Sequence, residues 1–189
     1  MRHHKKPIDS TPSKLLTQFA KEIVTESSGP IVDVGSGYGR NAIYLASFGA
    51  KVLCIDNNIE ALNFIKNTNI DLYRAKNGVN NIETIELDLI IEKWPFKAES
   101  LGAIISVHFL PEKLLDYFIR SLKKGGYLFI ETIGGQGGNY LQLPPKGFII
   151  NKISDLFEIK YFKERKVGPI QSEVASVKLF AKKNKSLYQ

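Results

Sequence analysis

Short apolar runs alternate with helical patterns through the first two thirds of this chain of 189 residues. The runs predicted to be strands are short and bounded by turn residues, and they cover 30–35, 51–56, 81–89, 101–109 and 127–133. The helical patterns between them cover 40–49, 58–67 and 111–126. Strands that are apolar throughout and alternate with helices favour a parallel sheet covered by helices on both faces. The sequence therefore predicts an α/β fold with a doubly wound sheet.

The last third of the chain has a different pattern. Residues 134–147 are rich in glycine and proline and are predicted to form a long loop, which a short helix at 148–157 follows. Residues 158–168 and 173–183 are strand-like, and only "PIQS" separates them. Because a parallel partner needs a longer crossover, we expect these two strands to be antiparallel.

Length and composition are those of one domain. With 43% apolar residues, the chain can bury a proper core, and no linker divides it. The whole chain is predicted to be a single domain, with a flexible basic tail at 1–9 and a second tail at 184–189. Residues 10–24 are predicted to form a helix capped near Ser10 or Thr11.

Several classes of partner and site are disfavoured. No apolar run approaches 18 residues, so we expect no membrane helix. Cys54 is the only cysteine, which leaves no disulfide and no zinc cluster, and a reducing cytoplasm is the simplest setting. His3 and His4 stand side by side on the basic tail, and no group of residues has metal-ligand spacing. No metal is therefore expected.

The formal net charge of +7 raises the question of a nucleic-acid partner. Much of the excess lies at the two ends, in "RHHKK" and in "KKNK". Neither segment interleaves aromatic residues with arginines, as a stacking platform for bases would. Nucleic acid is therefore disfavoured as a partner, although the charge keeps that alternative open.

Three glycines, Gly35, Gly37 and Gly39, follow the first predicted strand. Glycine lets the backbone turn sharply and approach a ligand without a Cβ clash, and the helix that follows offers unpaired N–H groups. Asp56 ends the second predicted strand, 21 positions after Gly35. A carboxylate there can accept hydrogen bonds from both ribose hydroxyls, at the sheet edge where doubly wound folds bind ligands. These residues predict a nucleoside site.

The spacing of the glycines favours one kind of nucleoside. Dinucleotide folds use G-x-G-x-x-G, whereas this chain has G-x-G-x-G followed by Arg40. Asp33 stands two residues before the first glycine, where a carboxylate repels a pyrophosphate and attracts a cation. S-adenosylmethionine carries a sulfonium and an ammonium group and no phosphate. The pattern therefore favours that cofactor over a dinucleotide.

The segments "VDVGSGYGRNAIYLA", "CIDNN", "ELDLI", "GAIISVHFL" and "SLKKGGYLFIET" together resemble class I S-adenosylmethionine-dependent methyltransferases over nearly the whole chain. "GRNAIYLA" and the compact size are similar to the small bacterial branch of the tellurite-resistance type. The resemblance implies a methyltransferase with a Rossmann-like, seven-stranded, mostly parallel sheet, a final antiparallel strand and helices on both faces.

The resemblance also implies positions for the cofactor. Asp33 matches the acidic residue near the amino group, and Asp56 matches the ribose carboxylate. Asn57 would lie under the adenine, although it could instead cap the following helix. Asp88 matches the residue at the adenine edge, and Ser106 lines the methionine side. The predicted cofactor-binding residues are Asp33, Gly35, Ser36, Gly37, Gly39, Asp56, Asn57, Asp88, Leu89 and Ser106.

Two residues are predicted to act on the acceptor side. His108 follows the fourth strand and is the candidate for acid–base work, and Tyr140 in the glycine-rich loop is the candidate for lining or closing the acceptor pocket. Each could instead be a packing residue, and Glu131 at the end of the fifth strand could face the acceptor or solvent. "SVHF" at 106–109 lacks the D/N-P-P-Y/F pattern of enzymes that methylate base amines.

The leading hypothesis is methyl transfer from S-adenosylmethionine to a small molecule. Its alternatives are a methyltransferase that acts on nucleic acid or protein, and a protein that binds the cofactor without catalysis. The scaffold hosts many substrates, so the sequence leaves the acceptor unidentified.

Overall fold

A computed structural model describes residues 11–75, 81–132 and 143–185, with side chains described up to 68 in the first range. The predicted tail at 1–9, Tyr140 with most of the glycine-rich loop, and the last four residues of the predicted second tail lie outside the described residues.

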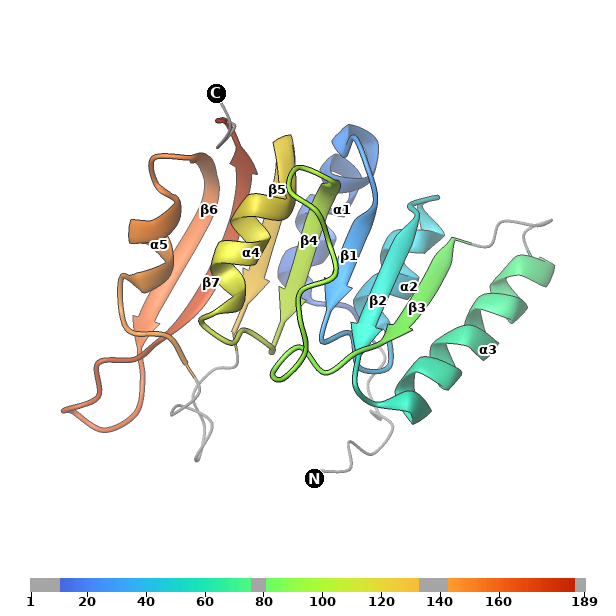
Figure 1. The fold of residues 1–189 in the computed structure, drawn as a ribbon, viewed down its shortest axis with the longest axis horizontal. Helices are drawn as coiled ribbons and strands as arrows, with labels where there is room; N and C mark the ends of the chain where they lie inside the picture. The colour runs from blue at the N-terminus through green and yellow to red at the C-terminus, as the bar shows by residue number, and fades with distance from the viewer. Residues whose placement is uncertain (1–10, 76–80, 133–142, 186–189) are drawn as a thin grey trace.

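The described residues contain one sheet of seven strands in the order β3-β2-β1-β4-β5-β7-β6 (Figure 1). Strands β1 to β5 run parallel, while β7 is antiparallel to both of its neighbours, β5 and β6. The predicted mostly parallel sheet and the predicted antiparallel pair are therefore confirmed. The strands are β1 (Ile31–Val34), β2 (Val52–Asp56), β3 (Ile82–Glu86), β4 (Leu101–Val107), β5 (Leu122–Glu131), β6 (Phe157–Lys166) and β7 (Ala175–Lys183).

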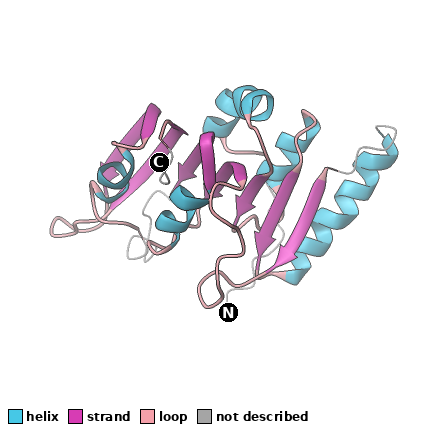
Figure 2. Cartoon of the chain, turned by 45° about the horizontal axis from the view of Figure 1, so that its top comes forward, coloured by secondary structure: helices cyan, strands magenta, loops and turns pink. Residues whose placement is uncertain are grey.

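Helices cover both faces of the sheet, as predicted (Figures 1 and 2). One face is covered by α1 (Lys14–Glu26), α2 (Arg40–Ser47) and α3 (Ile59–Ala75), and the other by α4 (Leu114–Ser121) and α5 (Phe148–Ile153). Each face has its own apolar core, and the sheet separates the two cores. Its central strand β4 contributes to both and is buried at every residue. Full burial of each large apolar side chain contributes about 1.5–3 kcal/mol, so the two cores hold the three layers together.

The first helix begins later than the sequence suggested. Its N-cap is Ser13, whose hydroxyl oxygen accepts the backbone N–H of Leu16 at 3.2 Å. The predicted cap near Ser10 or Thr11 is therefore wrong. Serine at the cap satisfies one of the unpaired N–H groups of the first turn, and Ser13 is itself buried because it also meets the end of β5.

The predicted helix at 111–126 is shorter in the structure, because α4 ends at Ser121 and residues 122–126 already belong to β5. The ammonium of Lys183 donates to the main-chain oxygens of Ile119 at 2.8 Å and Leu122 at 2.6 Å. Lys183 is only 1% exposed. It satisfies carbonyls that the end of the helix leaves unpaired, so a contact from the distant strand β7 fixes where α4 stops.

The carboxyl ends of β1, β2 and β4 meet at one edge of the sheet, at the bottom of Figure 1. The strand order reverses between β1 and β4, because the chain proceeds from β1 to β2 and β3 on one side and continues with β4 on the other. Open α/β sheets bind ligands at such a switch point.

Candidate cofactor and acceptor site

A cavity of about 460 Å³ opens at this switch point. Its volume lies within the range of pockets that bind small ligands. Its walls come from the turn after β1, the ends of β2 and β4, and the segment after β3. The lining residues are Gly35, Ser36, Gly37, Tyr38, Arg40, Asn41, Ile55, Asp56, Asn57, Leu87, Asp88, Leu89, Ile90, Val107, His108 and Phe109.

The three glycines after β1 all have positive φ, but their surroundings differ. A Cβ on Gly35 would lie 2.6 Å from the Cβ of Phe109, and one on Gly39 would lie 2.7 Å from Cγ1 of Ile65. A Cβ on Gly37 would meet no atom within 4 Å. Gly35 and Gly39 are therefore required by packing, while Gly37 keeps the wall of the cavity open to a ligand.

Asp56 organises the turn from the end of β2. Its Oδ2 accepts the backbone N–H of Gly37 at 2.7 Å, and its Oδ1 accepts that of Asn58 at 2.9 Å. Each carboxylate oxygen retains a second lone pair that can accept a ribose hydroxyl. Asn58 in turn accepts the N–H groups of Glu60 and Ala61, at 3.0 and 3.2 Å, so it caps α3 and leaves Asn57 at the cavity.

Asp33 lies on β1 and is 1% exposed. Its Oδ2 has no hydrogen-bond partner among the described residues. Burial is the main cause that raises the pKa of this carboxyl to about 7, and the charge of Asp56 adds to the rise, while the N–H of Ala42 and the Arg40 cation oppose it. A buried acceptor without a partner is costly, so a cationic group brought close to Asp33 would be stabilised.

At the end of the cavity beyond β3, Asp88 is held by two donors. Its Oδ2 accepts from the amide of Asn57 at 3.2 Å, and its Oδ1 accepts the backbone N–H of Ile90 at 2.9 Å. Leu89 packs its side chain into the core, where it is 3% exposed, and also lines the cavity. This arrangement presents a fixed carboxylate beside an apolar wall.

On the opposite side, the segment after β4 bends sharply at His108, which has a φ of 62°. Few non-glycine residues adopt this conformation. The N–H of His108 donates to the main-chain oxygen of Glu131 at 2.7 Å, and the hydroxyl of Ser106 donates to the main-chain oxygen of Phe109. These two hydrogen bonds stabilise the bend and place the imidazole at the cavity.

The pKa of His108 is lowered, first by partial desolvation and then by the Arg40 cation, while the negative charge of Glu131 opposes the shift. The ring is therefore mostly neutral at pH 7, and one of its nitrogens can accept a proton. A neutral imidazole at the end of β4 has the protonation state that a general base requires.

The structure brings most of the predicted site residues around one cavity. Those that line it are Gly35, Ser36, Gly37, Asp56, Asn57, Asp88, Leu89 and His108. Asp33, Gly39 and Ser106 do not line it: they lie beside it, where Gly39 packs on Ile65 and Ser106 braces the bend after β4. Tyr140 lies outside the described residues.

The predicted site lacked eight of the lining residues: Tyr38, Arg40, Asn41, Ile55, Leu87, Ile90, Val107 and Phe109. Arg40 and Asn41 follow the last glycine of the turn directly, and this position is the signal that could have found them. Phe109 carries no such signal, because an apolar residue at a strand end is usually part of the core.

Comparison with known proteins identifies the family of this chain. A family described as methyltransferase domain matches residues 31–126, about half of the chain and the part that builds the cavity. No curated protein sequence gives a significant match. Among the described residues, no helix is long and apolar enough to cross a membrane.

Solved structures of methyltransferases share the fold. A methyltransferase from Methanosarcina mazei has a TM-score of 0.60 and 18% identity, over 92% of this chain and 99% of that chain. A geranyl diphosphate C-methyltransferase from Streptomyces coelicolor A3(2) has a TM-score of 0.64 and 12% identity, over 90% and 78%. A tRNA (m1A58) methyltransferase from Aquifex aeolicus has a TM-score of 0.60 and 13% identity, over 97% and 74%.

This chain belongs to the methyltransferase domain family. The match agrees with the resemblance to class I S-adenosylmethionine-dependent methyltransferases in the sequence, and the seven-stranded sheet with its antiparallel β7 is the fold that this resemblance implied. The predicted activity, methyl transfer by an enzyme, is confirmed at this level.

Proposed function

We propose that this enzyme transfers the methyl group of S-adenosylmethionine directly to a small-molecule acceptor that approaches the His108 side of the cavity. The observation that carries the proposal is the division of the cavity walls. The carboxylates of Asp56 and Asp88 line the β2 and β3 side, with the buried Asp33 beside it, while a neutral imidazole and Arg40 line the β4 and α2 side.

The residues present fit the cofactor. The unpartnered buried oxygen of Asp33 suits the ammonium group, and Asp56 suits the ribose hydroxyls. Gly37 leaves the wall open where the nucleoside would lie, and Asp88 can accept from the exocyclic amine of adenine. These assignments are proposals that rest on the chemistry of the donors and acceptors around the cavity.

When bound, S-adenosylmethionine supplies a methyl group that its sulfonium already activates for displacement. The protein therefore contributes mainly alignment of the acceptor and exclusion of water. The bend at His108 holds the imidazole beside the acceptor side, where a ring nitrogen can take the proton of an acceptor that is protonated at neutral pH.

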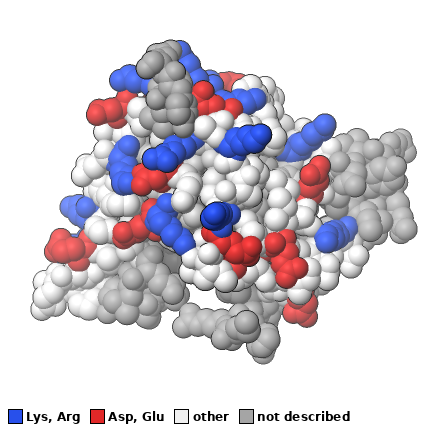
Figure 3. Space-filling model, in the orientation of Figure 1, with Lys and Arg blue, Asp and Glu red and all other residues white. Residues whose placement is uncertain are grey.

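The surface on one face of the molecule favours a small acceptor over a nucleic acid. On the face that Figure 3 shows, basic and acidic side chains are interspersed, and no continuous basic track crosses the described part. Binding along a nucleic-acid backbone needs such a track. Solved relatives act on both kinds of acceptor by their names, a geranyl diphosphate and a tRNA, so the fold alone favours neither.

The first test is calorimetric titration of the full chain with S-adenosylhomocysteine. We expect binding in the micromolar range, which Asp56→Asn weakens at least tenfold. The matched control is Glu86→Gln, at the exposed end of the neighbouring strand β3 and outside the cavity, which should leave the affinity unchanged. Absence of binding up to about 1 mM, roughly −4 kcal/mol, would refute the cofactor assignment.

The acceptor class is tested with methyl-labelled S-adenosylmethionine. The enzyme is incubated separately with a pool of small metabolites, with total RNA and with unfolded protein. Label that enters the small-molecule fraction, and that His108→Ala reduces, supports the proposal. Label that enters RNA or protein instead would contradict it.

A further inference from the structure

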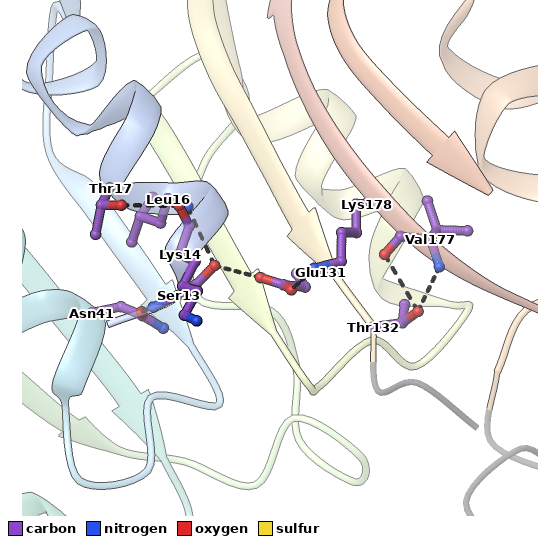
Figure 4. A network of polar contacts seen from close by, with 9 residues as sticks. All are labelled: Ser13, Lys14, Leu16, Thr17, Asn41, Glu131, Thr132, Val177 and Lys178. Carbon is purple, nitrogen blue, oxygen red and sulfur yellow. Dashed lines mark hydrogen bonds and ion pairs between the residues drawn. The ribbon is translucent and has the colours of Figure 1, made fainter. Parts of the chain in front are cut away.

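Glu131 is the last residue of β5, at the edge of the sheet that carries the cavity. Its side chain is only 12% exposed, and both carboxylate oxygens are engaged (Figure 4). Oε2 accepts from the hydroxyl of Ser13, and Oε1 accepts from the ammonium of Lys178 on β7. Hydrogen bonds to a charged group are about twice as strong as neutral ones, so this carboxylate is a firm junction between three elements.

The Ser13 end of this junction reaches the cavity wall. The backbone N–H of Ser13 donates to Oδ1 of Asn41 at 2.9 Å, and Asn41 lines the cavity from the first turn of α2. Ser13 also caps α1 through the N–H of Leu16. The Glu131 carboxylate is thereby connected to the start of α1 and, through it, to α2 (Figure 4).

The main chain of Glu131 holds the other side of the site. Its carbonyl oxygen accepts the N–H of His108 at 2.7 Å. A left-handed conformation at a non-glycine residue costs about 1–3 kcal/mol and persists only when neighbours hold it. Glu131 thus accepts hydrogen bonds both from the His108 bend and from Ser13 at the start of α1.

Charged groups face His108 from three elements. They are Arg40 at the start of α2, Glu131 on β5 and Lys178 on β7. Burial raises the pKa of Glu131, but its hydrogen bonds with Lys178 and Ser13 outweigh that effect and keep the pKa below its ordinary value. Glu131 is therefore ionised at neutral pH, and its charge favours a protonated imidazole while the two cations disfavour one.

We propose that Glu131 is a positioning residue of the acceptor side: its carboxylate pins the start of α1 against the site and sets the charge balance around His108. This inference rests on the proposed role of His108 and goes beyond it. When the imidazole takes a proton from the acceptor, the nearby carboxylate stabilises the cation that forms. The same side chain fixes Ser13 at the start of α1 and, through it, Asn41 at the cavity wall.

The test is an NMR titration of the His108 imidazole in the full chain, with His108→Gln to identify its resonance. Glu131→Gln removes the anion and should move the titration midpoint of His108 to lower pH. Lys178→Met removes a cation and should move the midpoint to higher pH. If these residues had only a structural role, both substitutions would loosen the site and move the His108 midpoint in the same direction, toward the ordinary value of histidine.

The matched control is Glu26→Gln. Glu26 also joins a hydroxyl and an ammonium, those of Tyr127 at 2.6 Å and Lys182 at 2.8 Å, but at the far end of α1. It should leave the His108 midpoint unchanged. Glu131→Asp keeps the charge and should restore the midpoint, which also tests the proposal if the glutamine variant fails to fold.

Two further measurements separate this proposal from the cofactor assignment. Hydrogen exchange at the amide of Leu16 should accelerate at least tenfold in Glu131→Gln and not in Glu26→Gln. Affinity for S-adenosylhomocysteine should stay within twofold, because Glu131 is not among the described residues that line the cavity. The proposal would be overturned if Glu131→Gln lost tenfold in affinity or left the exchange of Leu16 unchanged. It would also be overturned if Glu131→Gln and Lys178→Met did not shift the His108 midpoint in opposite directions. Failure of the wild-type enzyme to bind the cofactor product would instead refute only the proposed function.

Discussion

Replacing Asp33 with asparagine should stabilise the protein without cofactor while weakening the site. The pKa of Asp33 rises from its ordinary 3.8 to about 7, mainly because the carboxyl is buried. The folded state therefore holds the proton more tightly than the unfolded state. The stability that this proton contributes is fully present below pH 3.8 and is lost as the pH rises to about 7.

The size of this effect follows from the pKa change. Each pKa unit corresponds to about 1.4 kcal/mol, so the ionised carboxylate costs the unliganded fold about 4 kcal/mol above pH 7. Asparagine has nearly the same shape and no charge. Asp33→Asn should therefore be about as stable as the wild type near pH 4, and more stable by up to about 4 kcal/mol at pH 8.

Cofactor binding should show the opposite trend. An ammonium group prefers the ionised carboxylate, and at pH 6 only about a tenth of the unliganded molecules carry it. The wild type should thus bind S-adenosylhomocysteine about tenfold more weakly at pH 6 than at pH 8. Asp33→Asn should bind weakly at both pH values, without this dependence.

Urea unfolding at pH 4 and pH 8 measures the first effect, and calorimetry at pH 6 and pH 8 measures the second. The exposed Asp155 supplies the control, since Asp155→Asn should change neither quantity. Equal destabilisation by Asp33→Asn at both pH values would mean that the carboxylate has a partner in the folded state. That result would refute the reasoning.

Four substitutions test the structure around the site. Lys183→Met leaves two buried carbonyls without a donor and should cost about 2–4 kcal/mol in urea unfolding, and an unchanged midpoint would show that the lysine is dispensable. Gly37→Ala should destabilise the fold by roughly 1–2 kcal/mol and should chiefly weaken calorimetric binding of S-adenosylhomocysteine. Gly39→Ala should destabilise the fold by more than this, because the methyl group that it adds would meet Ile65, whereas the methyl group added by Gly37→Ala would meet no atom. Asp56→Asn turns one acceptor of a backbone N–H into a donor, so it should lower stability by about 1–3 kcal/mol in addition to its effect on affinity, and a change in affinity alone would contradict the turn-organising role.

Local patterns predicted the fold where they agree with the tertiary structure. Most of the parallel strands were visible because they are apolar on both faces, and the terminal hairpin because four residues cannot cross a sheet. The end of α4 was not visible, since "SLKKGG" suits a helix end as well as a strand start. There the deciding contact comes from Lys183, more than 60 positions along the chain.

In the candidate site, too, local patterns predicted some residues, while contacts made in the folded structure determined others. The glycine turn and Asp56 were predictable because their spacing places them at strand ends on one edge, and Asp88 because the sequence resembles class I methyltransferases. Spacing could not show that Ser106 bonds within its own bend, or that Glu131 meets Ser13 from 118 positions away. The contact between Glu131 and Ser13 depends on the packing of α1 against β5, which no local pattern encodes.

Strand β7 follows β6 in the chain yet lies between β6 and β5. During synthesis, β6 therefore has no neighbouring strand until β7 leaves the ribosome and inserts between β5 and β6. Until then β5 and β6 each expose an edge with unpaired backbone N–H and C=O groups, and such edges tend to pair with other chains. The many charged side chains of β6, from Glu158 to Lys166, favour solubility of the strand during that interval.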